Sequence, residues 1–311
     1  MKLVEKLIVL QKNVKDNNTL GLFDIRNLLK ERYDLFNAQK RLWRNSEDYD
    51  KLLKILQDLE NLNNEYDKTL EKINNDSNDI IRKEEIGLLQ RDYTYFKENE
   101  KTSINTLTKR IEHYPKEFID GIIGDIGYHS DWRWAGVELN PNIGKFTRSL
   151  LNCDPLYVYL GHVNDKQKIK EKFNNFYAER RLCFYDTYDK LPQESIGIAT
   201  SIANYEYWPT DPIIAEVKQV YKLLCPGGIF IFTFNDCEHS ASLDFCGSQF
   251  RCYNTKTLIQ SIIEGCGFDL IESKNIRNGS HSWMIVKKPG ERLSRKLSAP
   301  LVAIKRTDKD I

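Results

Sequence analysis

The first 112 residues of this 311-residue chain contain no proline and only two glycines, Gly21 and Gly87. Because these two residue types most often interrupt helices, their scarcity favours long helices in the first third of the chain. Cysteine is also absent there: all seven lie between Cys153 and Cys266, and no C-x-x-C pair occurs. The odd number and irregular spacing predict reduced thiols, as in a cytoplasmic protein.

The chain also lacks a run of about 18 apolar residues, which excludes an ordinary transmembrane helix. Its first ten residues include Glu5 and Lys6, so we expect no signal peptide. The charges nearly cancel, with 46 Lys and Arg against 45 Asp and Glu and a net charge of +1. The net charge therefore gives no overall electrostatic attraction to a membrane or to nucleic acid, and neither kind of partner is indicated.

Residues 1–112 carry apolar positions at helical spacing and are predicted to form a helical arm. A 4-3 pattern from Leu52 to Ile73, with Asn63 inside it, is typical of a coiled-coil seam, and a second stripe runs from Ile86 to Ile111. Asn and Asp residues between the stripes predict an antiparallel helical hairpin that turns near Asn75. Such an arm would expose apolar side chains, so binding of another protein or of a second copy stands beside plain core packing.

From residue 113 to 288 the sequence alternates short β-branched runs with amphipathic segments, which predicts an α/β domain. The predicted strands are Trp134 to Leu139, Leu156 to Gly161, Arg181 to Tyr185, Ile196 to Thr200, Gly228 to Phe234, Phe268 to Ser273 and Ser282 to Lys287. The predicted helices are Gly144 to Leu151, Asp165 to Ala178, Asp211 to Leu224 and Thr255 to Cys266. Residues 289–311 are predicted to form a basic tail, which is solvated, pairs with an acidic protein partner or neutralises phosphates.

Three segments of this domain carry a recognisable pattern. Glu138 ends a predicted strand before a tight turn that leads to Gly144, a geometry that aims backbone N–H groups and a carboxylate at a ligand. Asp186 follows another strand in an acidic loop. An amphipathic helix then leads through Pro226, Gly227 and Gly228 into an apolar strand.

In this order and spacing, the segments resemble class I S-adenosylmethionine (SAM)-dependent methyltransferases over residues 130–288. The resemblance implies a Rossmann-like sheet of seven strands, the last antiparallel, with SAM at the carboxyl ends of the central strands and methyl transfer as the reaction. The cofactor residues that it implies are Glu138 near the methionine amino group, Asn140, Asn142 and Gly144 in the cofactor turn, Asp186 and Thr187 at the adenine, and Asn204 at the methyl-transfer site. Candidates for the substrate pocket are Tyr205, Trp208, Asn235 and Asp236, and no catalytic base is identified.

The sequence departs from the family pattern at two places, both at the cofactor. Asn140 and Asn142 replace glycines, and an asparagine side chain fills space that glycine leaves for a ligand. The acid that holds the ribose hydroxyls is missing near Leu160 or Gly161. A methyltransferase of unknown acceptor and a degenerate structural or assembly protein that keeps only the fold therefore both remain open.

The helical segment before this domain, together with residues 232–237 and 284–290, also resembles methyltransferase-like proteins of large tailed phages. That resemblance implies phage structural proteins as partners and a location in the infected cell's cytoplasm or in the virion. Cys237, His239, Cys246 and Cys252 match no zinc module in their spacing, so no metal site is predicted.

Overall fold

The computed structural model describes residues 34, 49–99, 101, 104–141, 144–174, 181–248 and 251–292. The chain separates into two compact units, residues 1–91 and 92–311. The part of the predicted helical arm before residue 49, apart from Asp34, and the basic tail beyond residue 292 lie outside the described residues. No helix in the described part is both long and apolar enough to cross a membrane.

The described part of the first unit belongs to one helix, α3 (Tyr49–Glu98), which continues into the second unit. The predicted helical structure is confirmed over Tyr49–Glu98, but the predicted hairpin turn near Asn75 is wrong, because α3 runs through this position without interruption. Asn, Asp and Ser favour turns, yet each costs a helix well under about 1 kcal/mol, and residues 74–79 include neither glycine nor proline. The side chains of the Leu52 to Ile73 seam are not described, so the coiled coil stays a prediction.

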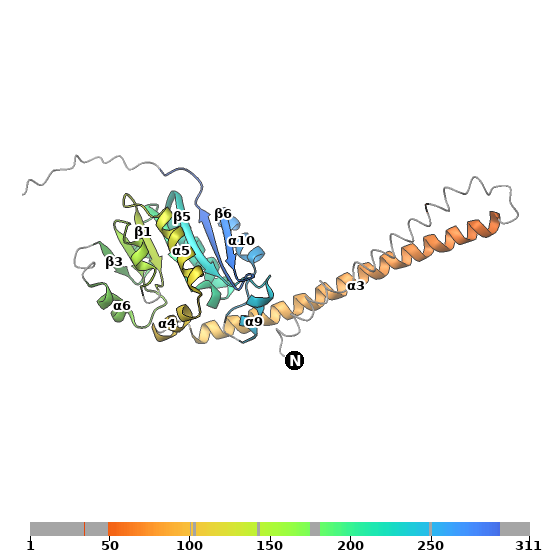
Figure 1. Cartoon of the computed structure of the whole chain (residues 1–311), viewed down its shortest axis with the longest axis horizontal. Helices are drawn as coiled ribbons and strands as arrows, with labels where there is room; N and C mark the ends of the chain where they lie inside the picture. The colour runs from red at the N-terminus through yellow and green to blue at the C-terminus, as the bar shows by residue number, and fades with distance from the viewer. Residues whose placement is uncertain are drawn as a thin grey trace, which may run out of the picture. The chain divides into compact units, whose positions relative to one another are not determined.

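The second unit contains a seven-stranded sheet in the order β3-β2-β1-β4-β5-β7-β6 (Figure 1). Its strands are β1 (Ala135–Leu139), β2 (Leu156–Tyr159), β3 (Leu182–Tyr185), β4 (Ile196–Ser201), β5 (Leu224–Phe234), β6 (Asp269–Ile276) and β7 (His281–Lys287). The first five strands pair in parallel, and β7 pairs antiparallel with β5 and β6. The predicted Rossmann-like sheet with a reversed last strand is confirmed.

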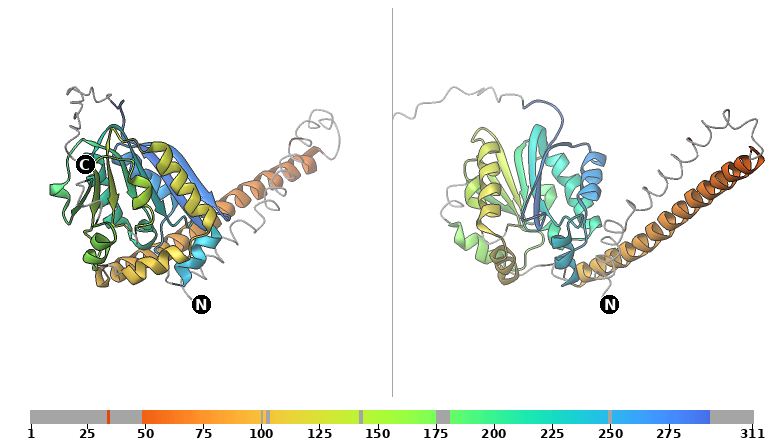
Figure 2. Two further views of the ribbon diagram at one scale, coloured as in Figure 1. Left: turned by 60° about the vertical axis from the view of Figure 1, so that its left-hand side comes forward. Right: turned by 45° about the vertical axis from the view of Figure 1, so that its right-hand side comes forward.

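Helices cover both faces of this sheet. α5 (Lys116–His129) and α6 (Lys166–Lys172) bury Ile122, Ile126 and Ile169 against one face. α8 (Thr210–Leu223) and α10 (Lys256–Gly265) pack on the other face through apolar residues such as Val217 and Ile263. The right-hand view of Figure 2 shows the yellow α5 and the blue α10 on opposite sides of the strands. The result is a three-layer α/β domain.

Two local predictions differ from the structure. The segment predicted as a helix from Gly144 to Leu151 forms only the short 3-10 helix η1 (Thr147–Leu150), whose bonds span three residues rather than four. The helix α5 was not predicted at all, because Gly121, Gly124 and Gly127 read as interruptions. The remaining short elements are α4 (Ile104–Glu112), η2 (Tyr188–Lys190), η3 (Tyr205–Tyr207) and α9 (Ser240–Gly247).

The strand order places a topological switch point between β1 and β4. From β1 the chain winds outward through β2 and β3, and from β4 it winds the other way into β5. In open α/β sheets, ligands bind in the crevice outside the carboxyl ends of the strands at such a point. The loops after β1 to β4 therefore define the place where a cofactor would lie.

Candidate functional site

Glu138 lies near the carboxyl end of β1, with its side chain buried beside η1. Its neighbours Val137 and Leu139 belong to the core beside α8, so Glu138 points to the opposite face of the sheet. The carboxyl group is 1 % exposed and accepts a hydrogen bond from the Thr147 hydroxyl of η1. Burial raises the pKa of Glu138 to about 8. At neutral pH this group is mostly a neutral acid.

Asn140, directly after β1, spans the crevice with its side chain. It has a positive φ of 49°, which asparagine tolerates better than most residues. Its Oδ1 accepts from the backbone N–H of His162 at 3.0 Å, and its Nδ2 donates to Oε2 of Glu216 at 3.1 Å. The amide is thus fixed at both ends, between the loop after β2 and helix α8.

Glu216 is the centre of a buried polar cluster at the switch point. Besides Asn140, its carboxyl group accepts from the hydroxyls of Ser201 at the end of β4 and of Tyr188 in η2, both at 2.8 Å. Only 3 % of Glu216 is exposed. Burial raises its pKa, and hydrogen bonds from Ser201 and Tyr188 act in the opposite direction. We call Asn140, Tyr188, Ser201 and Glu216 the Glu216 cluster.

Two tyrosine rings, those of Tyr159 and Tyr188, lie at the end of β2. Tyr159 stacks on Tyr188 with 4.0 Å between ring centroids. The Tyr159 hydroxyl lies where a side chain at Gly161 would project, so any larger residue there would require the tyrosine ring to move. Burial raises the pKa of Tyr159 to about 12, so its hydroxyl stays protonated. This is the place where the family resemblance puts the ribose-binding acid.

The other predicted cofactor residues are held in different surroundings. Asp186, after β3, is half exposed and forms an ion pair with Lys166 at 3.2 Å, while Thr187 follows it in the exposed loop before η2. Asn204, after β4, donates to the backbone oxygen of Leu139 at 3.2 Å and to Ser201 Oγ at 3.2 Å. It therefore ties the ends of β4 and β1 together.

In the cofactor turn, Gly144 has a φ of 80°, and the ring of Phe173 lies where its side chain would be. Only glycine fits at this position. Phe173 therefore packs directly against Gly144. Asn142, the remaining predicted residue of the turn, lies outside the described residues.

The four substrate-pocket candidates are brought to the same edge of the sheet but separate into two environments. Tyr205 and Trp208 lie in and after η3, and the Nδ2 of Asn254 donates to both of their backbone oxygens. Asn235 is fully buried and donates to the sulfurs of Cys237 and Cys246. Asp236 accepts from the backbone N–H of Lys256 at the start of α10 and of Glu238. Asn235 and Asp236 thus hold loops together.

No family model matches the chain, and no curated protein sequence matches it. Among solved structures, it is similar to a SAM-dependent methyltransferase from Mesorhizobium loti, with 14 % identity and a TM-score of 0.43 over 54 % of this chain and 99 % of that one. It is also similar to an O-methyltransferase family protein from Burkholderia thailandensis, with 10 % identity and a TM-score of 0.46 over 57 % of each chain. A third similar structure is the 1,6-didemethyltoxoflavin-N1-methyltransferase of that organism with bound S-adenosylhomocysteine, with 12 % identity and a TM-score of 0.42 over 55 % of this chain and 78 % of that one.

Likeness at such identities concerns the fold alone, and the assignment rests on the strand order and the reversed β7. The domain has the methyltransferase Rossmann-like fold. The comparisons do not address the resemblance to phage proteins, which stays a prediction.

The residues of this methyltransferase-fold domain do not fit SAM as they are arranged. The Glu138 carboxyl group accepts a hydrogen bond from Thr147, the Asn140 side chain is bonded to His162 and Glu216, and the Tyr159 hydroxyl lies where a side chain at Gly161 would project. A cofactor there would have to displace buried polar groups that already bond to each other. The assignment of SAM as cofactor therefore rests on the fold, and the individual binding roles stay predictions.

Sequence reasoning missed the residues that close the crevice. Glu216 did leave a signal: it is an acid within the apolar stripe of Ile213, Val217 and Val220 on α8, and an acid on the buried face of a helix needs buried partners. Tyr159 and Tyr188 left none, since tyrosine at the end of a strand is unremarkable.

Proposed function

We propose that the chain is a methyltransferase-fold protein that does not transfer methyl groups and instead acts through binding, as a structural or assembly component. The observation that carries this proposal is the Glu216 cluster, which joins the ends of β1, β3 and β4 to α8, while Asn140 also accepts from His162 in the loop after β2. The hydrogen bonds from Asn140 and Ser201 to Glu216 are buried, and those from Tyr188 to Glu216 and from His162 to Asn140 are partly buried. The cluster performs the structural role that a bound cofactor would have in an active relative.

We predict that calorimetric titration of the purified chain with SAM or S-adenosylhomocysteine will show no saturable binding up to about 1 mM. The physical reason is that opening the crevice leaves several buried donors without acceptors, at about 1–3 kcal/mol each. Binding with a micromolar dissociation constant would overturn the proposal.

The second candidate function is SAM-dependent methyl transfer to an unidentified acceptor. It is favoured by Asp186, which is half exposed at the carboxyl end of β3 with Lys166 as its ionic partner. If SAM binds, Asp186→Asn should weaken it about 5- to 150-fold, the effect of losing a charged hydrogen bond. Asp189→Asn, which alters an exposed acid three residues away, is the matched control.

The binding role that we propose runs through α3. At 1.5 Å per residue, its 50 residues span about 75 Å, longer than a small domain. Ile80 and Ile86 are 46 % and 47 % exposed. Burying each against a partner would contribute up to about 1.5–3 kcal/mol, so we propose that this helix binds a second copy of the chain or another protein.

We predict that light scattering will give a mass that is a multiple of 36.5 kDa for the full chain, and that the double substitution Ile80→Glu with Ile86→Glu will return it to 36.5 kDa. Asn75→Glu with Asn78→Glu adds the same two charges at exposed polar positions and should leave the mass unchanged. A monomer at every concentration would exclude the second copy. A different partner would then have to be retained from native extract by the natural chain and lost by the double variant.

A further inference from the structure

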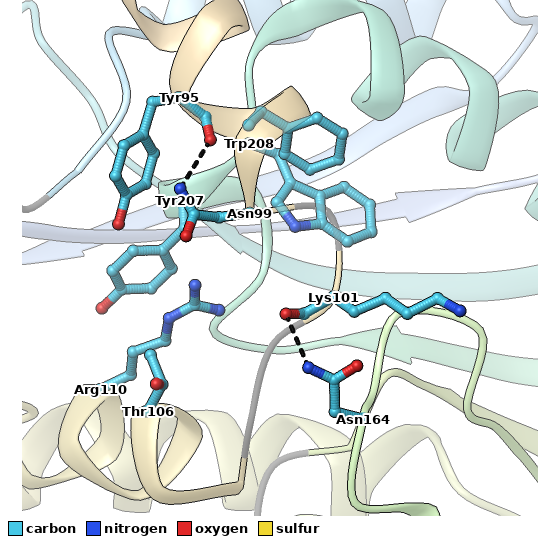
Figure 3. A pocket seen from close by; sticks show the side chains of 9 residues that line it. Tyr95, Asn99, Lys101, Thr106, Arg110, Asn164, Tyr207 and Trp208 are labelled. Atoms are coloured by element: carbon cyan, nitrogen blue, oxygen red, sulfur yellow. Dashed lines mark hydrogen bonds between the residues drawn. The ribbon is translucent and has the colours of Figure 1, made fainter.

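A cavity of about 260 Å³ lies where the end of α3 and the start of α4 face η3 (Figure 3). All of its lining residues belong to the second unit. Four of the nine are aromatic, Tyr95, Phe96, Tyr207 and Trp208, and two are cations, Lys101 and Arg110. None of the nine carries a carboxylate. The cavity therefore combines flat apolar walls with uncompensated positive charge.

Arg110 is the cation placed most firmly in this cavity. Its guanidinium lies 3.8 Å from the centre of the Tyr207 ring, and Figure 3 shows it directed into the space beside Thr106 of the same helix. Burial lowers the pKa of Arg110, because the guanidinium is largely desolvated. Among the residues that the structure describes, none accepts a hydrogen bond from this guanidinium or forms an ion pair with it. Its planar fork of donors is therefore available to an anion.

We call Tyr95, Phe96, Tyr207 and Trp208 the aromatic wall. Glu206, which precedes Tyr207 in the sequence, forms no ion pair with Arg110. Its Oε1 accepts a hydrogen bond from the Tyr114 hydroxyl at 2.6 Å, and the residue is buried. Its charge favours the protonated form of Arg110 from a distance. Glu206 thus helps to hold the cation in place without filling the cavity.

The aromatic wall is fixed before any ligand arrives. The indole of Trp208 meets Phe96 edge-on at 5.8 Å and His162 at 4.8 Å between ring centroids. The side-chain amides of Asn99 and Asn164 donate to the backbone oxygens of Tyr95 and Lys101 and hold the opposite wall. A fixed aromatic surface binds a planar ring at little cost in conformational entropy.

We propose that this cavity binds a small anion that carries a planar aromatic ring, with Arg110 holding the anionic group and the aromatic wall holding the ring. The volume is slightly below the usual range for ligand pockets, which limits the ligand to one ring system with one phosphate or carboxylate, as in a nucleoside monophosphate. The cavity shares no lining residue with the Glu216 cluster. The inference therefore holds whether or not SAM binds.

The test is calorimetric titration of the full chain with the four 5′-ribonucleoside monophosphates, with adenosine and with inorganic phosphate. We expect at least one nucleotide to bind below about 1 mM, and adenosine and phosphate each to bind at least about tenfold more weakly. Arg110→Gln should weaken the nucleotide about tenfold or more. Lys109→Gln removes the neighbouring, exposed charge on α4 and should change affinity less than about twofold.

Three results would overturn the inference: no nucleotide binds, phosphate alone binds as tightly as every nucleotide, or Arg110→Gln binds as well as the natural chain. If Arg110→Gln does not fold, as judged by thermal unfolding, Arg110→Lys replaces it, because lysine keeps the charge and loses the planar fork. That variant should then show an intermediate affinity. Binding equal to that of the natural chain would show that the fork is not used.

Discussion

Replacing Glu216 with alanine should lower the free energy of unfolding by about 4 kcal/mol. The carboxyl group is the shared acceptor for Asn140, Ser201 and Tyr188, all at the carboxyl edge of the sheet. Each buried donor left without an acceptor costs about 1–3 kcal/mol, and the cavity left by the side chain adds to this. Urea unfolding followed by circular dichroism measures the effect.

Glutamine at the same position is the discriminating variant, with an expected loss of about 1 kcal/mol or less. The Asn140 amide is oriented by the His162 N–H, so its Nδ2 must donate, and the glutamine oxygen can accept it. The new N–H group can then face Ser201, whose hydroxyl can accept as well as donate. Lys218→Gln, on the exposed face of α8, controls for substitution in this helix. Equal stability of the alanine and glutamine variants would contradict the Glu216 cluster.

The second large effect is a pH dependence that Glu138 imposes on stability. Its pKa is raised from an ordinary value of 4.5 to about 8 in the folded chain. The unfolded chain therefore releases this proton from about pH 4.5 upward, whereas the folded chain keeps it until about pH 8. The stabilisation is fully present below pH 4.5 and is lost as the pH rises toward 8.

The variant Glu138→Gln should remove this dependence, since glutamine cannot ionise. At pH 8 we expect it to be more stable than the natural chain by on the order of 3 kcal/mol, because each tenfold change in the ionisation constant corresponds to about 1.4 kcal/mol. At pH 4 the two should be equally stable. His281, whose burial lowers its pKa to about 4, titrates alike in both chains and cancels in the difference.

Thermal unfolding at pH 4, 6 and 8 checks this prediction. Glu264→Gln, at an exposed position on α10, is the matched control. The difference in stability between this variant and the natural chain should not change with pH. If the stability difference between Glu138→Gln and the natural chain is also the same at pH 4, 6 and 8, Glu138 is ionised in the folded chain. That outcome would also restore it as a candidate partner for an ammonium group.

The sequence predicted the sheet well because strands leave a local signal. All seven predicted runs correspond to strands, and the predicted helices on the α8 and α10 segments agree within one or two residues. These segments combine β-branched or amphipathic patterns with Gly and Pro at their ends, so local and global preferences agree. The errors fall where local preference was overridden: α5 tolerates three glycines, and α3 passes through Asn75.

The site was predicted less completely, for a different reason. Positions at strand ends, such as Glu138, Asp186 and Asn204, follow from strand order and could be found. The contacts that these side chains make could not be predicted, because they depend on residues far away in the sequence. Asn140 and Glu216 lie 76 positions apart and meet only through the folded sheet.

The convergence of several side chains on Glu216 also constrains how this protein can change over time. Glycine at position 140 alone would leave the His162 N–H and a carboxyl oxygen without their partner before any cofactor gained a place. Replacing Glu216 first would leave the hydroxyls of Tyr188 and Ser201 without their acceptor. Because the effects of touching residues do not add independently, a change of side chains at this crevice requires coordinated substitutions. Each single substitution within the Glu216 cluster costs stability before a second one can compensate for it.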